Sequence, residues 1–450
     1  MKIYNTLTHQ IEELKPLNPP TVGMYSCGPT VYDYQHIGHM RRYVGDDILI
    51  RVLKANGFQV HHVMNITDVG HLVSDSDTGE DKMEKGAKKF GKSVWDIAKM
   101  FEQQFKDSCQ ELNILLPKDL MHATDFIKEQ IALIQILEKK GFTYKTTDGI
   151  YFDTSKFPDY FKLSRQNPEE LRAGIRIEMG EKRNVSDFAL WKFSPKDEKR
   201  QMEWESPWGT GFPGWHIECS AMSMKALGDT FDIHTGGIDH INIHHTNEIA
   251  QAEAATGEKF VNYWVHHAFL QVEGEKMSKS LGNFYTVQDI IEKGYDPITL
   301  RYLYLQTHYR QEMNFTFEAL TAAQNALNRL RKEVSIYGQG SDIIQEYEDQ
   351  FMDAINDDLN MPKALAVLWE VIRSDKSTSE KAATVFKFDE VLGLSLGEAR
   401  GIIQKKQEIP AEVKKLFEER GALREQKKYE EADKIRERII EMGFKVEDKF

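Results

Sequence analysis

Two histidines and two lysines, far apart in the chain, have the types and spacing that suit the binding of a polyphosphate. His36 and His39 lie three residues apart at the predicted start of a helix, with Gly38 between them. The start of a helix attracts anions because its first backbone amides are unpaired and its dipole is positive there, and a glycine lets a flat base approach the backbone. Lys276 and Lys279 stand in a loop of small and polar residues, which can close over a polyphosphate as negative charge builds up on it. Each pair alone is also typical of structural histidines or of a solvated surface loop.

Four further side chains have the chemistry of metal ligands. Cys27 lies just beyond the first predicted strand, and Cys219 follows a glycine-rich stretch. His244 and Glu248 have the i, i+4 spacing that places both on one face of a helix. Two thiolates, an imidazole and a carboxylate form a reasonable zinc shell, although a set this dispersed indicates zinc less strongly than paired Cys-x-x-Cys motifs. A single buried cysteine more often packs as a small apolar residue, so the residues alone leave both interpretations open.

The segments around these residues predict two parallel β-α-β units. Their elements follow in this order: a strand from Thr21, a helix over about 38–55, a strand over 58–64, then a strand over 231–234, a turn over 235–237, a helix over 244–256 and a strand over 262–266. Strands that alternate with helices favour a doubly wound parallel sheet of the Rossmann-like α/β class. Such a sheet binds ligands at the carboxyl ends of its strands, which is where Cys27 and the histidine pair are expected.

The rest of the chain predicts an insertion in this sheet domain and an all-α end. The middle segment mixes one helix with short strand-like pieces, and after about Phe315 alanine, leucine and charged residues recur at helical spacing. We expect the following division: a split parallel-sheet domain over 1–116 and 206–275, a connective insertion over 117–205, a mobile lysine-loop region over 276–315, a helical bundle over 316–400 and a small C-terminal unit over 401–450.

Length and composition exclude several classes of protein. A chain of 450 residues suggests about three domains, and 40% hydrophobic with 29% charged residues is ordinary globular composition. The net charge of -13 argues against indiscriminate binding to nucleic acids or membranes. Three cysteines are too few for a disulfide framework, and neither an apolar signal segment nor a run of about 20 apolar residues occurs. We therefore expect a cytoplasmic protein that does not span a membrane.

Two glycine motifs match nucleotide-binding patterns but lack the context that such sites need. Residues 86–93 fit the phosphate-loop pattern G-x-x-x-x-G-K-S, yet a charged segment rather than a buried strand precedes them. Residues 209–214 fit the dinucleotide pattern G-x-G-x-x-G, but no strand leads into them and Pro213 is awkward in a loop whose amides must reach a pyrophosphate. We interpret both matches as coincidental.

The histidine and lysine motifs together resemble the two signature motifs of class I aminoacyl-tRNA synthetases, in the same order and with a large insertion between them. Four further stretches, 25–33, 65–68, 214–220 and 244–248, match cysteinyl-tRNA synthetases, and the match runs almost from start to end. The resemblance implies that the first motif binds the adenine and phosphates of ATP with Mg²⁺, and that the second stabilises the transition state of pyrophosphate displacement. It implies these catalytic or ATP-binding residues: Thr30, His36, Gly38, His39, Lys276 and Lys279.

The resemblance also decides the interpretation of the metal set. It implies one Zn²⁺ per chain, held by Cys27, Cys219, His244 and Glu248, and a pocket for L-cysteine lined by Gly28, Thr67, Trp215 and Asp239. Zinc binds a thiolate strongly and a neutral hydroxyl weakly, whereas an apolar pocket separates near-isosteres only about 10- to 200-fold. We therefore expect serine to be excluded without an editing domain, and Glu248 to be the weakest protein ligand.

The implied reaction forms cysteinyl-adenylate from L-cysteine and ATP and then transfers cysteine to the 3′ end of tRNA(Cys). The helical end would bind the tRNA, with these residues as contacts: Arg424, Lys427, Lys428, Tyr429, Arg436 and Arg438. Two alternatives are a ligase that joins cysteine to a small amino sugar and a catalytically silent RNA-binding or metal-sensing relative. About 135 residues after Phe315 argue against the first, and the intact histidines and lysines argue against the second. A monomer is the default expectation.

Overall fold

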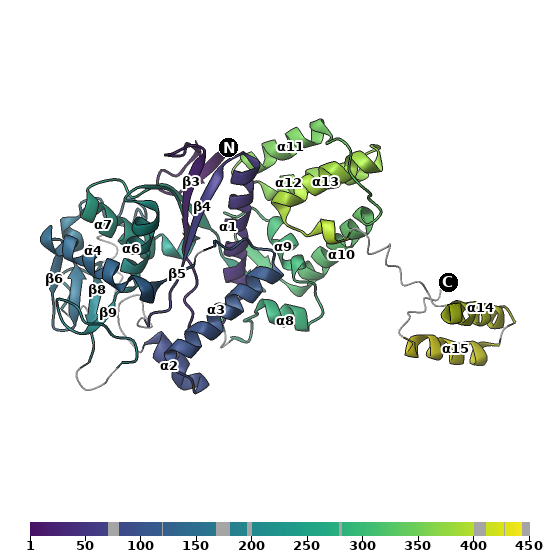
Figure 1. The fold of residues 1–450 in the computed structure, drawn as a ribbon, viewed down its shortest axis with the longest axis horizontal. Coiled ribbons are helices and arrows are strands. Elements are labelled where there is room, and N and C mark those ends of the chain that lie inside the picture. The colour runs from purple at the N-terminus through teal and green to yellow at the C-terminus, as the bar shows by residue number, and fades with distance from the viewer. Residues whose placement is uncertain are drawn as a thin grey trace.

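A parallel sheet lies at the centre of the computed structural model, which describes residues 1–70, 81–118, 120–167, 181–195, 200–278, 281–399, 411–426 and 428–442 (Figure 1). Its five strands stand in the order β11, β10, β3, β4, β5, and every neighbouring pair is parallel. The strands are β3 (Thr21–Ser26), β4 (Gln59–Ile66), β5 (Leu120–His122), β10 (Phe231–Gly237) and β11 (Val261–His267). The strand order reverses between β3 and β10, and ligands of such sheets bind at the carboxyl ends of the strands beside that reversal.

Helices cover both faces of this sheet, with α1 and α3 on one side and α6 and α7 on the other (Figure 1). They are α1 (Ile37–Ala55), α3 (Val94–Glu111), α6 (Trp215–Leu227) and α7 (His244–Thr256), and a shorter helix, α2 (Lys82–Phe90), packs on α3. The predicted doubly wound sheet and its helices over 38–55 and 244–256 are therefore confirmed. The predicted turn over 235–237 is wrong, because β10 continues through Gly237 in parallel register with β11.

A second, antiparallel sheet forms the insertion, together with α4 (Ile127–Lys139). It contains β6 (Thr143–Lys145), β7 (Gly149–Phe152), β8 (Phe188–Phe193) and β9 (Gly211–Pro213) in sequential order. Its limits differ from the expected 117–205, since β5 pairs with β4 in the central sheet and β9 pairs with β8 in the insertion. Strands of three residues are too short to show a periodic pattern, so the sequence gives no signal for them.

Neither glycine motif forms a strand followed by a phosphate-binding loop. Gly86 lies inside α2, and Gly91 ends that helix with a left-handed backbone, φ 64°. Gly211 lies in β9, where a Cβ atom would stand 2.0 Å from the carbonyl oxygen of Lys192. This second motif thus lets β9 approach β8 closely, because any larger residue would collide with the neighbouring strand.

A small three-stranded sheet follows the central one and carries the first lysine of the lysine loop. It consists of β12 (Leu270–Val272), β13 (Glu275–Lys276) and β14 (Met313–Phe315), with α8 (Val287–Glu292) and α9 (Ile298–Leu305) between β13 and β14. The turn between β12 and β13 is formed by Glu273 and Gly274, with φ 52° and 82°. Two consecutive residues with positive φ are typical of a tight type I′ hairpin turn.

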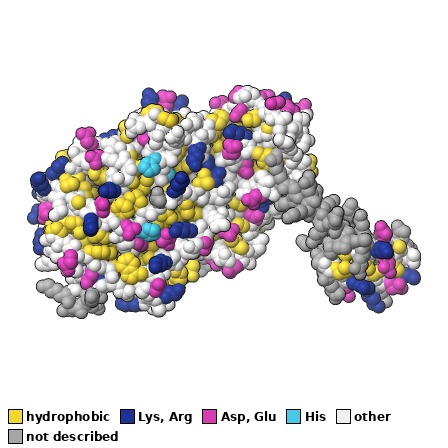
Figure 2. Space-filling model, in the orientation of Figure 1, with side chains coloured by type: hydrophobic (Ala, Val, Ile, Leu, Met, Phe, Trp, Pro, Cys, Tyr) yellow, Lys and Arg dark blue, Asp and Glu magenta, His cyan; other side chains and the backbone are white. Residues whose placement is uncertain are grey.

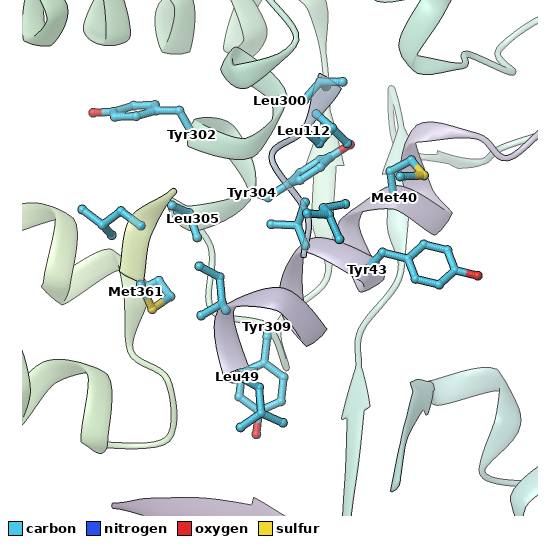
Figure 3. Close-up of a cluster of buried hydrophobic side chains, with 14 of the residues drawn as sticks. Met40, Tyr43, Leu49, Leu112, Leu300, Tyr302, Tyr304, Leu305, Tyr309 and Met361 are labelled. Atoms are coloured by element: carbon cyan, nitrogen blue, oxygen red, sulfur yellow. The ribbon is translucent and has the colours of Figure 1, made fainter. Parts of the chain in front are cut away.

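A helical bundle follows β14, as expected from the helical spacing after Phe315. Its helices are α10 (Phe317–Val334), α11 (Gln345–Asn356), α12 (Met361–Arg373) and α13 (Thr378–Leu392). Apolar side chains of α1 and α9 and of the start of α12 meet where the bundle joins the sheet domain, among them Met40, Tyr304 and Met361 (Figure 3).

The two ends of the chain add short elements. At the start, β1 (Lys2–Asn5) and β2 (Gln10–Glu13) form an antiparallel pair, and at the end α14 (Ala411–Glu425) and α15 (Tyr429–Glu441) pack against each other. Within the described ranges, every helix is too short or too polar to cross a lipid bilayer.

Candidate active site

The four predicted metal ligands converge where β3 and β10 end. Cys27 directly follows β3, Cys219 lies on α6, and α7 carries both His244 and Glu248. One ligand atom from each of the four side chains lies within 4.8 Å of the others, and all four residues are buried. Residues up to 221 positions apart in the chain thus form one compact set of two sulfurs, one imidazole and one carboxylate.

The carboxylate of Glu248 is the electrostatic centre of this set. Its Oε2 lies 2.9 Å from His234 Nε2, and its Oε1 lies 3.0 Å from His244 Nε2. Burial alone would raise the pKa of Glu248, but the two imidazoles outweigh it and hold the pKa at about 2. Burial likewise opposes the charged form of His244, yet Glu248 and Cys219 raise its pKa to about 10. Both carboxylate oxygens of Glu248 are thus paired with imidazoles inside the cluster.

The two thiols are held in the protonated form by their surroundings. Burial raises the pKa of Cys27, and the hydrogen bond with Cys27, together with burial, raises the pKa of Cys219 well above its ordinary value. A bound divalent cation reverses this because it stabilises thiolates directly. The backbone at Cys27 is fixed by Arg42 of α1, whose Nη2 donates to the Cys27 carbonyl oxygen.

A second possible ligand set overlaps the first and was missed in the sequence. It shares Cys27 and Glu248 but replaces the other two ligands with His234 and His245. His245 Nε2 lies 3.3 Å from Cys27 Sγ, while its Nδ1 lies 2.8 Å from His266 Nε2. The density of histidines between positions 234 and 245 was the available signal, but spacing cannot tell which of them face the same point.

A further histidine, His216 of α6, orients the predicted ligand His244. The Nδ1 atoms of the two rings lie 3.0 Å apart, so one of them donates to the other and His244 keeps Nε2 for the centre of the cluster. Such outer partners fix the ring orientation of a metal-bound histidine. The ring of Trp215, a predicted pocket residue, lies 5.0 Å from the ring of His244 and borders the same space.

The other predicted pocket residues differ in their contacts and in their exposure. Gly28 donates its backbone N–H to Asn65 Oδ1 at 2.7 Å, and a Cβ atom there would stand 1.5 Å from the Asn65 carbonyl oxygen, so only glycine fits. The buried hydroxyl of Thr67 donates to Glu218 Oε2 at 2.9 Å, beside Cys219. Asp239 lies in an exposed turn after β10. Sequence reasoning did not assign a role to Glu218.

The histidine motif forms the start of α1. His36 caps the helix by accepting from the backbone N–H of His39 at 3.2 Å, and the two rings stack with centroids 3.5 Å apart. Desolvation, followed by the charges of His36 and Arg42, lowers the pKa of His39, although its side chain reaches the surface. His39 is therefore neutral near pH 7. Thr30 forms an isolated bridge to Thr67 at the ends of β3 and β4, which joins the nucleotide motif to the pocket residues.

The lysine loop starts and ends beside this motif. Lys276 is exposed on β13, and the backbone N–H of Ser278 donates to Asn283 Oδ1 at 2.7 Å. The backbone N–H of Ile37 donates to the carbonyl oxygen of Tyr285 at 2.9 Å. The segment that follows the lysine loop is therefore hydrogen-bonded to the start of α1. Lys279 lies outside the described residues.

Comparison with known proteins matches three families along the chain. Residues 13–325 match the family described as tRNA synthetases class I (C) catalytic domain, residues 350–397 match the DALR domain, and residues 406–449 match the cysteinyl-tRNA ligase anticodon binding domain. The chain is 50% identical over 449 residues to "Cysteine--tRNA ligase 1" of Burkholderia lata, covering 100% of this chain and 95% of the relative. It is 44% identical over 480 residues to the "Cysteine--tRNA ligase" of Treponema denticola, covering 100% and 98%.

A solved structure supports the fold independently. Methionyl-tRNA synthetase of Mycobacterium tuberculosis, in complex with methionyl-adenylate, superimposes with a TM-score of 0.59 at 15% sequence identity, covering 84% of this chain and 93% of that chain. At this level of identity the likeness concerns the architecture alone.

Proposed function

Because the chain belongs to the cysteine–tRNA ligase family of class I aminoacyl-tRNA synthetases, we propose that its buried cluster selects L-cysteine by holding one Zn²⁺ ion. The ligands would be Cys27, Cys219, His244 and Glu248. The reaction has two steps: cysteine and ATP give cysteinyl-adenylate and pyrophosphate, and a terminal ribose hydroxyl of tRNA(Cys) then attacks the carbonyl carbon. The activity needs no protein nucleophile, because the adenylate is itself the activated acyl donor.

One observation carries the zinc proposal. Two thiols, an imidazole and a carboxylate converge within 4.8 Å at the switch point of the sheet, and all four residues are buried. Buried charged groups are paired or coordinate metals, and these four side chains offer the donor atoms of a metal site. This donor set suits zinc, and the alternative set with His234 and His245 suits it less because it offers only one sulfur.

The bound ion would supply a soft Lewis acid that coordinates the thiolate of cysteine and binds the hydroxyl of serine weakly. The chain's own residues then shape the rest of the pocket. The ring of Trp215 lies beside the ring of His244. Gly28 has no side chain, which lets the segment after β3 approach Asn65 of β4. The hydroxyl of Thr67 is held by its hydrogen bond to Glu218. Four protein ligands and a substrate sulfur crowd a usually tetrahedral ion, so Glu248 is expected to lengthen its bond when cysteine arrives.

We further propose that the two motifs position ATP with Mg²⁺ and stabilise the charge on its phosphates. Neutral His39 can donate a hydrogen bond to bound ATP. The ring of His36 is held by its hydrogen bond with the backbone N–H of His39 and by stacking on the His39 ring. Lys276 and Lys279 would close over the departing pyrophosphate. Replacement of one preorganised charge donor, as in Lys279→Ala, should lower adenylate formation about 10²-fold or more, and near-normal pyrophosphate exchange by that variant would refute the role.

The test of the zinc proposal combines metal analysis with amino-acid specificity. Purified protein should contain one zinc per chain and catalyse ATP–pyrophosphate exchange with cysteine but not with serine. Cys27→Ser should lose zinc and cysteine affinity together. Retained cysteine binding without metal would contradict the assignment, and equal zinc–oxygen distances at Glu248 with and without cysteine would contradict its role as the weakest ligand.

We propose that tRNA(Cys) is held by the helical end of the chain. The matched anticodon-binding family covers 406–449, and the predicted contacts on α14 and α15 are exposed where their side chains are described: Arg424, Lys428, Tyr429, Arg436 and Arg438. Lys427 lies outside the described residues. A cytoplasmic location and a monomeric state stay predictions, and the amino-sugar ligase finds no support among the relatives.

A further inference from the structure

Helix α2 carries a concentration of positive charge that the functions above do not use. Residues 82–92 contain five lysines and one acidic residue, Glu84, within a chain whose net charge is -13. This segment includes most of the rejected phosphate-loop pattern. Asp81 caps its start, accepting from the backbone N–H groups of Met83 and Glu84, and Gly91 ends it.

The helix has one apolar and one basic face. Met83 and Ala87 are buried in the main core and Phe90 packs against it. The opposite side exposes four lysines, here named the basic face: Lys85, Lys88, Lys89 and Lys92. Among the described residues no carboxylate lies within ion-pair distance of these ammonium groups.

The helix dipole explains only part of this arrangement. Lysines in the last turn of a helix interact favourably with its negative end, and this accounts for Lys88 and Lys89. Lys85 lies in the middle of the helix and Lys92 beyond its end, so neither gains from that interaction. Among the described residues the four ammonium groups have no ion-pair partner, although Lys89 lies 4.8 Å over the Phe90 ring. Like charges so close in the chain repel one another, and a polyanion laid across them would remove the repulsion.

Helix α2 lies beside the loop that leads into the histidine motif. A Cβ atom at Gly86 would stand 3.2 Å from the carbonyl oxygen of Tyr32, so α2 packs directly on the segment between Thr30 and His36. Lys and Arg side chains gather along the lower edge of the molecule in Figure 2, where Figure 1 draws α2. The buried side of α2, which carries Gly86, thus packs on this loop, and the basic face lies on the outer side of the same helix.

Two exposed aromatic residues lie in the segments next to α2. Trp95, three residues after Lys92, is 43% exposed, and Tyr34, in the loop before α1, is 41% exposed. The edge-on contact with Phe101, at a centroid distance of 5.0 Å, fixes the ring of Tyr34. Positive charge interleaved with exposed aromatic rings is the combination that binds single-stranded nucleic acid, because the phosphates pair with lysines and the unpaired bases stack on rings.

We propose that the basic face of α2 binds the phosphates of the single-stranded 3′ end of the tRNA. This rests on the proposed function, in which the terminal ribose must reach an adenylate beside the loop over 30–36. A strand that approaches this loop across the outer side of α2 passes the basic face. Lys85 and Lys89 are four residues apart, a rise of about 6 Å along the helix, so the basic face can contact neighbouring phosphates of one strand.

The test compares two variants that lose the same charge. The first removes the basic face: Lys85→Gln, Lys88→Gln, Lys89→Gln and Lys92→Gln. The control replaces four exposed lysines near the opposite edge of the central sheet, where its strands begin: Lys15→Gln, Lys54→Gln, Lys225→Gln and Lys259→Gln. Each variant lowers the net charge by four, so any general electrostatic effect on RNA binding is matched.

The basic-face variant should raise the KM for tRNA(Cys) at least about 10-fold near 0.15 M salt, whereas the control should change it less than about 3-fold. Each lost contact with a single strand reduces the slope of log Kd against log salt by about 0.7, so the slope should fall by about 2 to 3. An acceptor-stem minihelix with its 3′ overhang should show the same loss. Cysteine-dependent ATP–pyrophosphate exchange should be unchanged in both variants, which also reports that they are folded.

Each other outcome has a definite meaning. An unchanged KM and salt slope in the basic-face variant overturns the proposal. A loss seen with whole tRNA but not with the minihelix also overturns it, because the lysines would then bind another part of the tRNA. If the unmodified protein shows no cysteine-dependent exchange, the proposed function fails instead, and direct tRNA binding by the two variants still tests the basic face.

Discussion

Two buried polar regions of this protein look alike in composition and differ in completeness. In the junction between α1 and the helical bundle, Arg301 and Asp47 have fully buried side chains that pair at 2.5 Å. The remaining guanidinium N–H groups of Arg301 donate to the carbonyl oxygens of Leu392 and Leu112, and Asp47 also accepts from Arg51 and from the backbone of Leu115. Every charged group in the junction is satisfied by the chain itself.

The cysteine–histidine cluster is not satisfied in this way. Tyr25 Oη and His240 Nδ1 are both buried there without a hydrogen-bond partner among the described residues. Native structures leave few buried polar atoms unpaired. A satisfied network therefore indicates a structural joint, and a group of unpaired atoms around thiols and imidazoles indicates a place for a ligand. Changes to the two regions should accordingly have separable effects.

The largest effect is expected from breaking the junction. Arg301→Ala leaves the Asp47 carboxylate buried with one ion partner fewer, and such a loss lowers the free energy of unfolding by about 3 to 5 kcal/mol. Urea denaturation followed by circular dichroism measures it. Arg329→Ala, which removes an exposed arginine of α10, is the matched control and should cost less than about 1 kcal/mol. If Arg301→Ala lowers the free energy of unfolding by no more than the control, the junction is not the structural joint that distinguishes it from the cluster.

The next effect concerns the cluster. Cys219→Ala should abolish zinc binding and reduce the preference for cysteine over serine to the 200-fold or less that an apolar pocket supplies, from an expected value near 10⁴. A chelator should lower the melting temperature of the unmodified protein, because an ion that binds only the folded state stabilises it, and should leave this variant unaffected. Arg301→Ala should still respond to the chelator. An equal response of Cys219→Ala would place the metal elsewhere.

A smaller effect is expected from the outer partner of His244. His216→Gln removes the ring that orients it, and loss of such a partner typically lowers metal affinity 10- to 100-fold. Competition with a chromophoric chelator measures the affinity. His61→Gln, at an exposed histidine on β4, controls for the loss of an imidazole in general. Unchanged affinity in the His216 variant would favour the alternative ligand set over the one containing His244.

The smallest effect is expected at a turn that belongs neither to the junction nor to the cluster. Glu273 holds a positive φ of 52° before Gly274 in the β12–β13 turn, and asparagine tolerates this backbone better in a type I′ turn. Glu273→Asn should raise the free energy of unfolding by about 0.5 kcal/mol without changing metal content or specificity. Thermal unfolding detects the shift, and a loss of stability would show that the glutamate side chain contributes a contact of its own.

Local patterns in the sequence were enough to predict much of the site and the fold. The i, i+4 spacing of His244 and Glu248 predicted one helix face, and α7 carries both toward the same cluster. The start of α1 at the histidine motif followed from the helix pattern and the preceding strand. These features depend on residues that are close in the chain, so their periodicity is readable without tertiary information.

Contacts between distant segments depended on the order of the strands. By itself the sequence determined the types of the ligands, the two nucleotide motifs, the alternation of strands with helices and the helical end. Only the tertiary structure placed His234 and His245 beside the Glu248 carboxylate and His216 beside His244. It also assigned β5 and β9 to their sheets and joined Arg301 to Asp47 across 254 positions of the chain. The physical reason is that a residue type specifies what a side chain can bind, whereas strand order and helix packing decide which side chains meet.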